Sequence, residues 1–265
     1  MQSFERAYAE LIADILTNGN TRATRNAITL SKFGMSLEVP VGNKFPLIQG
    51  RKMYPSGVFG ELAAMLRRPK CVEDFTKWGC NYWNLWADEE GKLDIDYGNT
   101  WFDFNGFDQI ADLKDKLANN PTDRRMLINS WRPGAKLSLP CCHYSYQFYV
   151  SEGQLDMIWT QRSVDMMVGL PSDIVFAAAW LIAIANEFGL TPGKVKMDLG
   201  DCHVYEPHLT AAGEYVERVM VNRNFDPVLY DYTQPTGADF CEFEPSFLRL
   251  GYYSHLDPIK LELLA

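Results

Sequence analysis

The run IVFAAAWLIAIA, residues 174–185, carries no charged side chain. It is too short to cross a bilayer, which takes about 20 apolar residues. We therefore interpret it as a buried helix that follows Asp173 and ends at Gly189, since glycine commonly follows the last residue of a helix. A helix that is apolar on all sides has to be covered on all sides, and this requirement limits how the rest of the chain can fold.

The composition of the 265-residue chain, 47% hydrophobic and 13% aromatic, favours one compact domain over residues 1–265. The formal net charge of -9 argues against a nucleic-acid or membrane partner, because both attract basic surfaces. A small anionic ligand held by a few arginines is compatible with this charge. The N-terminal segment MQSFERAYAELIADIL carries acidic residues and lacks the apolar run of a signal peptide.

Helical and strand-like segments are mixed along the chain, and this order predicts the α+β class. We expect helices over residues 4–16, 56–66, 107–117 and 208–220. We expect extended segments over residues 27–40, 126–131, 142–151 and 155–162, and a further strand before GDCHVYEPH at 200–208. The tryptophan-rich stretch 81–101 predicts an ordered surface loop.

The six cysteines show no metal-ligand spacing, so we expect no metal site and free thiols in a reducing cytoplasm. Two of them, Cys141 and Cys142, open a strand-like segment, LPCCHYSYQFYV. Strict alternation predicts that two sets of side chains face opposite ways. One set is Cys142, Tyr144, Tyr146, Phe148 and Val150, and the other is His143, Ser145 and Gln147.

The spacing alone favours an inert, buried Cys142, as most free cysteines are small hydrophobes. A nucleophilic thiol instead needs a lowered pKa, which nearby arginines supply. Arg124 and Arg125 in DRRMLINSW and Arg162 in QRSVD stand at the ends of predicted strands. They can converge on one pocket or remain solvated surface charges.

Further polar residues have an ordinary and a functional interpretation. Glu61 lies in an apolar helix face, where it is either exposed or buried for proton transfer with a raised pKa. Asp173 precedes the apolar helix, which makes helix capping its ordinary role. His203 and Tyr205 alternate onto one strand face, as a core pair or as partners of a ligand hydroxyl.

Several segments in chain order carry unusual residue combinations: WNLWADEEGKLDIDYGNTW, NPTDRRMLINSW, LPCCHYSYQFYV, QRSVDMMVGLPSDI and GDCHVYEPH. Together with the C-terminal IKLELLA, they resemble the motifs of the thymidylate synthase family over nearly the whole chain. The resemblance implies a mixed β-sheet flanked by helices and a homodimer packed sheet to sheet. It also implies transfer of a one-carbon unit from 5,10-methylenetetrahydrofolate to C5 of a pyrimidine nucleotide.

The resemblance assigns catalytic roles. Cys142 is expected to add to C6 of the pyrimidine, while Cys141 only fills space. Glu61 is expected to move protons through ordered water, and Tyr97 to assist loss of the C5 proton. The catalytic set also takes in the neighbours of the nucleotide base, His143 and Asp173.

The resemblance assigns binding roles too. The residues expected on the nucleotide are Arg25, Gln161, Arg162, Ser163, Asp165, Asp173, His203 and Tyr205, with Arg124 and Arg125 reaching across from a second subunit. Arg25 fits the N-terminal phosphate position slightly better than Arg22 does. The residues expected on the folate are Trp83, Asp165, Gly169, Ser172, Leu264 and Ala265.

Two positions depart from the members that make dTMP, which carry Phe and Asn where this chain has Ser172 and Asp173. A carboxamide complements the N3–H and O4 of uracil, whereas a carboxylate accepts a hydrogen bond from the cytosine amino group. Asp173 therefore resembles the deoxycytidylate hydroxymethylases, a phage branch of the family. There, water rather than hydride quenches the intermediate, and Ser172 leaves room for that water. The expected product is 5-hydroxymethyl-dCMP, in a host cytoplasm if the chain is phage-encoded.

Other functions stay open. His143 is retained as in uracil-using members, and a protonated Asp173 can donate to O4, so dUMP hydroxymethylation and dTMP synthesis are alternatives. A non-catalytic nucleotide- or RNA-binding relative is the alternative of a different class. The joint presence of Cys142, Glu61 and Tyr97 speaks against it, because binding alone needs no thiol.

Overall fold

The computed structural model describes residues 3–222 and 225–264. The α-helices are α1 (Phe4–Asn18), α2 (Pro55–Met65), α3 (Val72–Thr76), α4 (Gly98–Phe102), α5 (Gln109–Asn119), α6 (Gly169–Glu187) and α7 (Leu209–Val221). The strands are β1 (Asn20–Ala23), β2 (Ile28–Pro40), β3 (Lys44–Phe45), β4 (Leu127–Asn129), β5 (His143–Ser151), β6 (Gln154–Asp165), β7 (Thr191–Tyr205), β8 (Val228–Tyr232) and β9 (Leu248–Leu250). Short 3₁₀ turns are η1 (Trp83–Trp86), η2 (Glu206–His208), η3 (Phe240–Glu242) and η4 (Pro245–Phe247).

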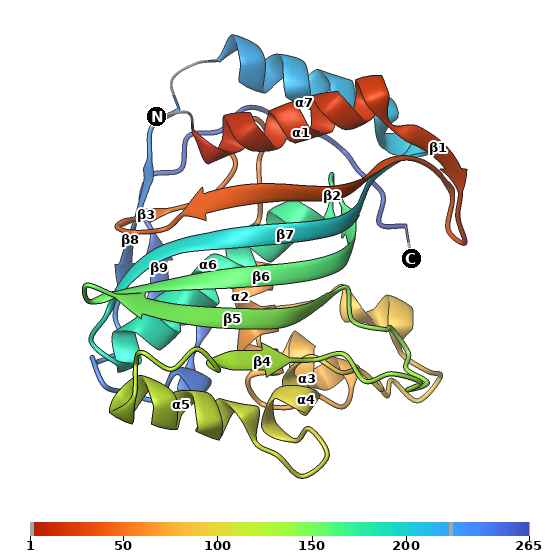
Figure 1. The fold of residues 1–265 in the computed structure, drawn as a ribbon. Coiled ribbons are helices and arrows are strands. Elements are labelled where there is room, and N and C mark those ends of the chain that lie inside the picture. The colour runs from red at the N-terminus through yellow and green to blue at the C-terminus, as the bar shows by residue number, and fades with distance from the viewer. Residues whose placement is uncertain (1–2, 223–224, 265) are drawn as a thin grey trace.

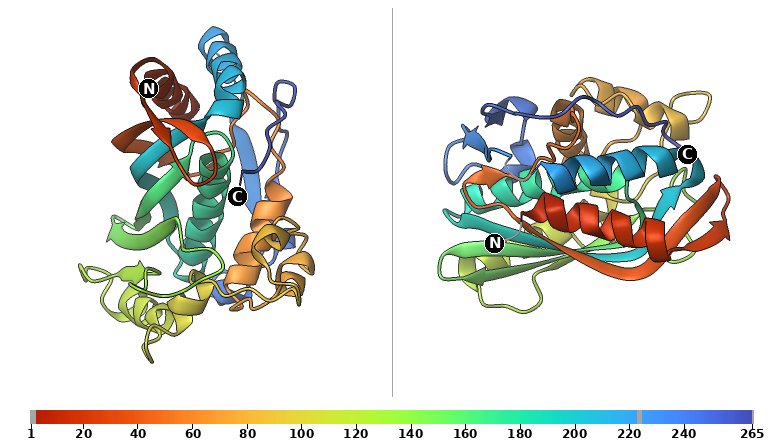
Figure 2. Two further views of the ribbon diagram at one scale, coloured as in Figure 1. Left: turned by 90° about the vertical axis from the view of Figure 1, so that its right-hand side faces the viewer. Right: turned by 90° about the horizontal axis from the view of Figure 1, so that it is seen from above.

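A mixed six-stranded sheet runs through the molecule in the order β1-β2-β7-β6-β5-β4 (Figure 1). Its neighbouring strands are antiparallel except β6 and β7, which are parallel. A second, three-stranded sheet has the order β3-β8-β9. Helices α6 and α2 lie behind the large sheet in Figure 1, and its front face is open to the viewer; Figure 2 shows the same arrangement from the side. The predicted α+β class is confirmed.

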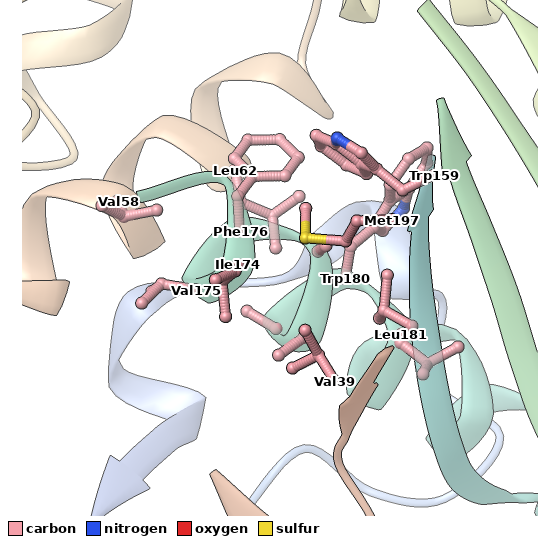
Figure 3. Close-up of a cluster of buried hydrophobic side chains, with 14 of the residues drawn as sticks. Val39, Val58, Leu62, Trp159, Ile174, Val175, Phe176, Trp180, Leu181 and Met197 are labelled. Atoms are coloured by element: carbon pink, nitrogen blue, oxygen red, sulfur yellow. The ribbon is translucent and has the colours of Figure 1, made fainter. Parts of the chain in front are cut away.

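Helix α6 forms the centre of the core. It connects the parallel strands β6 and β7, which cannot be joined by a tight turn. Figure 3 shows its side chains between α2 on one side and residues of the sheet on the other. Trp180 of α6 also stacks on Trp101, with ring centroids 4.4 Å apart. The predicted buried helix is confirmed.

The start of α6 differs from the prediction. The helix begins at Gly169, so Asp173 lies inside it, and the expected helix-capping role of Asp173 is wrong. The carboxylate of Asp165 instead accepts hydrogen bonds from the backbone N–H of Met167 (2.8 Å) and Val168 (3.2 Å) just before the helix. Because α6 spans Gly169–Glu187, it is long and apolar enough to cross a membrane, contrary to the expectation, yet 78% of its apolar window is buried within the fold.

A β-bulge changes which way the first residues of β5 face. The register of β5 against β6 shifts between His143 and Ser145. His143 is consequently buried, with its ring 4.2 Å from that of Trp159. It faces the core together with Tyr146 and Phe148, so the predicted opposite facing of His143 is wrong. An extra residue in one strand reverses the alternation at that point.

The carboxylate of Glu5 ties α1 to the segment that leads into α2. Its Oε1 accepts hydrogen bonds from the backbone N–H of Gln49 (2.8 Å) and Gly50 (2.7 Å), and from the hydroxyl of Tyr215 (2.8 Å). Glu5 is only 3% exposed. Because this segment precedes α2, the contact fixes the position of the helix that carries Glu61.

We expect Glu5→Ala to lower the free energy of unfolding by roughly 3 kcal/mol, since it leaves buried N–H groups without an acceptor. Glu10 on the same helix is the matched control, because it only pairs with Arg6 at the surface. Glu10→Ala should cost less than about 0.5 kcal/mol. Urea unfolding measures both, and equal losses would contradict the structural role of Glu5.

Candidate active site

A cavity of about 1110 Å³ opens where β5, β6 and β7 meet α2, α6 and the tryptophan-rich loop. Single-ligand pockets commonly span about 300–1000 Å³, so this cavity lies just above that range. The five residues predicted to be catalytic all line it: Glu61, Tyr97, Cys142, His143 and Asp173. The cavity therefore brings together residues more than a hundred positions apart in the sequence.

The thiol of Cys142 lies at the start of β5. Burial raises its pKa above the ordinary value, and the guanidinium of Arg162 acts in the opposite direction. Arg162 thus lies near the thiol as the sequence suggested, but its effect on the thiol pKa is smaller than that of burial. Arg162 is held in place by donating from Nε to the carbonyl of Cys141 (2.9 Å) and from Nη2 to that of Pro140 (3.1 Å).

Tyr97 is held beside Cys142 by an unusual backbone conformation. Its φ is +50°, in the left-handed region that non-glycine residues seldom adopt. Its hydroxyl accepts a hydrogen bond from the backbone N–H of Cys142 (2.8 Å). The next residue, Gly98, packs so closely on α2 that a Cβ there would lie 1.8 Å from the carbonyl oxygen of Met65. The Tyr97–Gly98 pair thus joins the backbone at Cys142 to the helix of Glu61.

The carboxyl group of Glu61 has a protein donor on each oxygen. Trp83 donates from Nε1 to Oε1 (2.8 Å), and the Tyr82 hydroxyl donates to Oε2 (2.6 Å). Burial raises the pKa of Glu61 to about 6, and both hydrogen bonds lower it. The contact with Tyr82 was not anticipated from the sequence, and its one signal is its position directly before Trp83.

A short hydrogen-bond relay orients Asp173. The indole of Trp159 donates to Oε1 of Gln161 (3.1 Å), and the Gln161 amide nitrogen donates to Oδ2 of Asp173 (2.8 Å). The indole N–H can only donate, so this contact fixes which way the amide points. Burial is also the main reason that the pKa of Asp173 lies well above its usual range.

His143 contributes no charge to the cavity at neutral pH. Burial lowers its pKa to about 3. Its Nδ1 lies 2.6 Å from the hydroxyl of Tyr146.

The predicted phosphate-binding residues divide into two groups. Arg25, Arg162 and Ser163 line the cavity. Arg22 instead pairs with Asp201, which leaves Arg25 as the better candidate of the two. Arg124 and Arg125 line a separate surface hollow, and Arg125 pairs with Asp123 (2.9 Å). One chain alone does not bring this pair to the cavity.

The remaining predicted binding residues lie around the same cavity. His203 and Tyr205 line it from β7, with ring centroids 4.9 Å apart. The other predicted residues that line it are Trp83, Gln161, Asp165, Gly169, Ser172 and Leu264. The carbonyl of Leu264 accepts a hydrogen bond from Asn26 (3.4 Å), which places the tail at the cavity mouth. Ala265 lies outside the described residues.

Residues 3–222 and 225–264 contain no group of three or more His, Cys, Asp or Glu side chains that could hold a metal ion.

Comparison with known proteins gives this site a class. The family model described as Thymidylate synthase matches residues 6–265. A thymidylate synthase from Corynebacterium aurimucosum (strain ATCC 700975 / DSM 44827 / CIP 107346 / CN-1) is 34% identical over 264 residues, which cover 95% of each chain. The matched family consists of one-carbon transferases that use 5,10-methylenetetrahydrofolate as co-substrate. The chain belongs to the thymidylate synthase family.

The raised thiol pKa gives a testable expectation. Alkylation of Cys142 by iodoacetamide should be slow near pH 7 and should rise about tenfold per pH unit, because only the thiolate reacts. Arg162→Gln should slow it further, since the cation that favours the thiolate is gone. Mass spectrometry of the peptide that contains Cys142 measures the rate, with glutathione as the free-thiol reference. A rate that is independent of pH between about 6 and 8 would contradict the raised pKa.

Proposed function

We propose that the chain, as a single catalytic domain over residues 1–265, converts dCMP to 5-hydroxymethyl-dCMP with 5,10-methylenetetrahydrofolate and water. The observation that carries this proposal is the carboxyl group of Asp173, which lines the same cavity as Cys142. Members of the family that make dTMP are expected to have a carboxamide at this position. The proposed reaction thus follows from the family, and the proposed base follows from the side chain of Asp173.

The relay through Gln161 supports recognition of cytosine. Gln161 donates to Oδ2 of Asp173, so a proton on the neutral acid has to sit on Oδ1. The neutral acid then offers one donor, Oδ1–H, and a free lone pair on Oδ2. Cytosine can take up this proton at N3 while its 4-amino group donates to the carboxylate that remains, whereas N3 of uracil already carries a proton. A buried mismatch costs about 1–3 kcal/mol, which is enough for a tenfold preference.

The other residues take the roles that the family motifs suggest. Cys142 adds to C6 of the pyrimidine, and Tyr97, whose hydroxyl lies next to it, assists removal of the C5 proton. Glu61 accepts and returns protons. Arg25, Arg162 and Ser163 hold the 5′-phosphate, and His203 and Tyr205 hold the sugar 3′-hydroxyl.

Ser172 supports hydroxymethyl transfer rather than methyl transfer. Its hydroxyl donates to the carbonyl of Val168 (3.2 Å) and borders the cavity. A serine fills much less of the folate side than the expected phenylalanine would. Water therefore has room to reach the reactive carbon.

We infer a homodimer that packs through the open face of the large sheet. This face carries exposed apolar side chains, among them Leu127 of β4 and Tyr149 of β5. Exposed large hydrophobic groups gathered on one face are typical of an interface. Arg124 and Arg125 precede β4, so pairing of the sheets would carry them toward the phosphate site of the second subunit.

The free state of all six cysteines supports a reducing cytoplasm.

The alternative is dUMP as substrate, with dTMP or 5-hydroxymethyl-dUMP as product. It is favoured by the 34% identity to a protein named thymidylate synthase. The neutral acid also offers some support, because Oδ1–H can donate to uracil O4 while Oδ2 accepts from N3–H. In that case the position of the Asp173 carboxyl group along the N3–C4 edge of the pyrimidine decides which base is preferred.

The products decide between these functions. The protein is incubated with 5,10-methylenetetrahydrofolate and either dCMP or dUMP, and the nucleotide product is identified by mass spectrometry. We expect a gain of a hydroxymethyl group on dCMP without formation of dihydrofolate. Dihydrofolate and dTMP from dUMP would instead establish the alternative. Cys142→Ser should abolish turnover with either nucleotide.

Asp173→Asn tests base recognition directly. We expect the ratio of kcat/KM for dCMP to that for dUMP to fall at least about tenfold, because the amide complements uracil but has no proton to give to N3 of cytosine. Asp115→Asn is the matched control, since Asp115 is exposed on α5 and bonds only to Asn119. An unchanged ratio in Asp173→Asn would show that this residue does not select the base.

A further inference from the structure

Both oxygens of the Glu61 carboxyl group are bound by neutral donors of one short segment, Tyr82 and Trp83. These two hydrogen bonds oppose the effect of burial on the pKa of Glu61, and no cation among the described residues contributes to it. The other titratable groups that face Glu61 are Cys80, which precedes Tyr82, and Asp173 of α6. Neither supplies a positive charge, so the loss of one hydrogen bond should be felt strongly.

The two donors differ in chemistry. The indole N–H of Trp83 can only donate, so it holds Oε1 in its unprotonated form. The hydroxyl of Tyr82 can donate and can also accept. When Glu61 is protonated, the proton therefore lies on Oε2. The Tyr82 hydroxyl can then rotate so that its oxygen accepts a hydrogen bond from this proton. The contact between Tyr82 and Glu61 can form in both protonation states, but the hydrogen bond to the ionised carboxylate is the stronger of the two.

We propose that Tyr82 is a positioning residue that keeps Glu61 ionised at neutral pH and directs proton uptake to Oε2. This inference rests on the role of Glu61 in the proposed function, but not on which pyrimidine is the substrate. An acceptor of protons has to be ionised before it acts. Tyr82 supplies the hydrogen bond to the charged form that makes this possible within a desolvated site.

The direction of the effect follows from the contacts. Burial raises the pKa of Glu61 to about 6, so most of this group is ionised at pH 7. Without the hydroxyl of Tyr82, burial would raise the pKa further, by about one unit for a hydrogen bond to a charged group. Activity that needs the ionised form is then lost at low pH and kept at high pH.

The experiment compares Tyr82→Phe with the wild type across pH, using release of tritium from C5-labelled dCMP and dUMP with 5,10-methylenetetrahydrofolate. We expect the acid limb of kcat/KM to move up by about one pH unit, with about fivefold lower activity at pH 6 and little change near pH 8.5. Asp173 is present in both proteins, so its titration does not produce the difference. Tyr54→Phe is the matched control, because Tyr54 precedes α2 but is 65% exposed and does not contact Glu61.

A second substitution should shift the pH profile in the opposite direction. 3,5-Difluorotyrosine at position 82 keeps the ring and has a more acidic hydroxyl, which donates a stronger hydrogen bond. The acid limb should then move to lower pH. Infrared difference spectra of the protonated carboxyl band, assigned with Glu61→Gln, should give the same order of midpoints without turnover, and thermal unfolding checks the fold of each variant.

The outcomes separate this inference from the proposed function. If Glu61→Gln turns over like the wild type, the role of Glu61 in the proposed function is wrong. A different outcome is an inactive Glu61→Gln together with two Tyr82 variants that shift neither the acid limb of the kcat/KM profile nor the titration midpoint of the Glu61 infrared band. In that case only the role of Tyr82 is wrong. A uniform loss of activity at every pH in Tyr82→Phe, with an unmoved midpoint, would likewise overturn it and indicate a purely structural contact.

Discussion

The packing of α6 between the large sheet and α2 is the constraint on which the site depends. The middle of this helix is the core, while its first turn, with Gly169, Ser172 and Asp173, borders the cavity. The helix cannot turn or slide without exposing apolar surface at about 25 cal/mol per Å². Burial of the core therefore also sets the distance from Asp173 to Gln161 on β6.

The electrostatics of the cavity are dominated by desolvation. Burial shifts Cys142, Asp173 and His143 toward their neutral forms, even though Arg162 opposes this shift at the thiol. Glu61 differs from these three groups, because burial raises its pKa only to about 6 and leaves most of it ionised at pH 7.

Much of the fold was predictable from the sequence, because periodicity and glycine signals act locally. The details that failed depend on tertiary partners. The start of α6 was misplaced because the backbone N–H groups before it bond to Asp165, and Asp173 looked equally suitable. The facing of His143 was missed because a bulge depends on the neighbouring strand. Tyr82 was missed because only the folded loop brings its hydroxyl to Glu61.

The close contact between Gly98 and Met65 restricts how this part of the chain can vary. Any side chain at position 98 has to push the loop away from α2, and this loop includes Tyr97, whose hydroxyl contacts the backbone of Cys142. Such a shift would move Cys142 relative to the helix of Glu61. A single substitution at position 98 would thus disturb the site although it changes none of the residues that line the cavity.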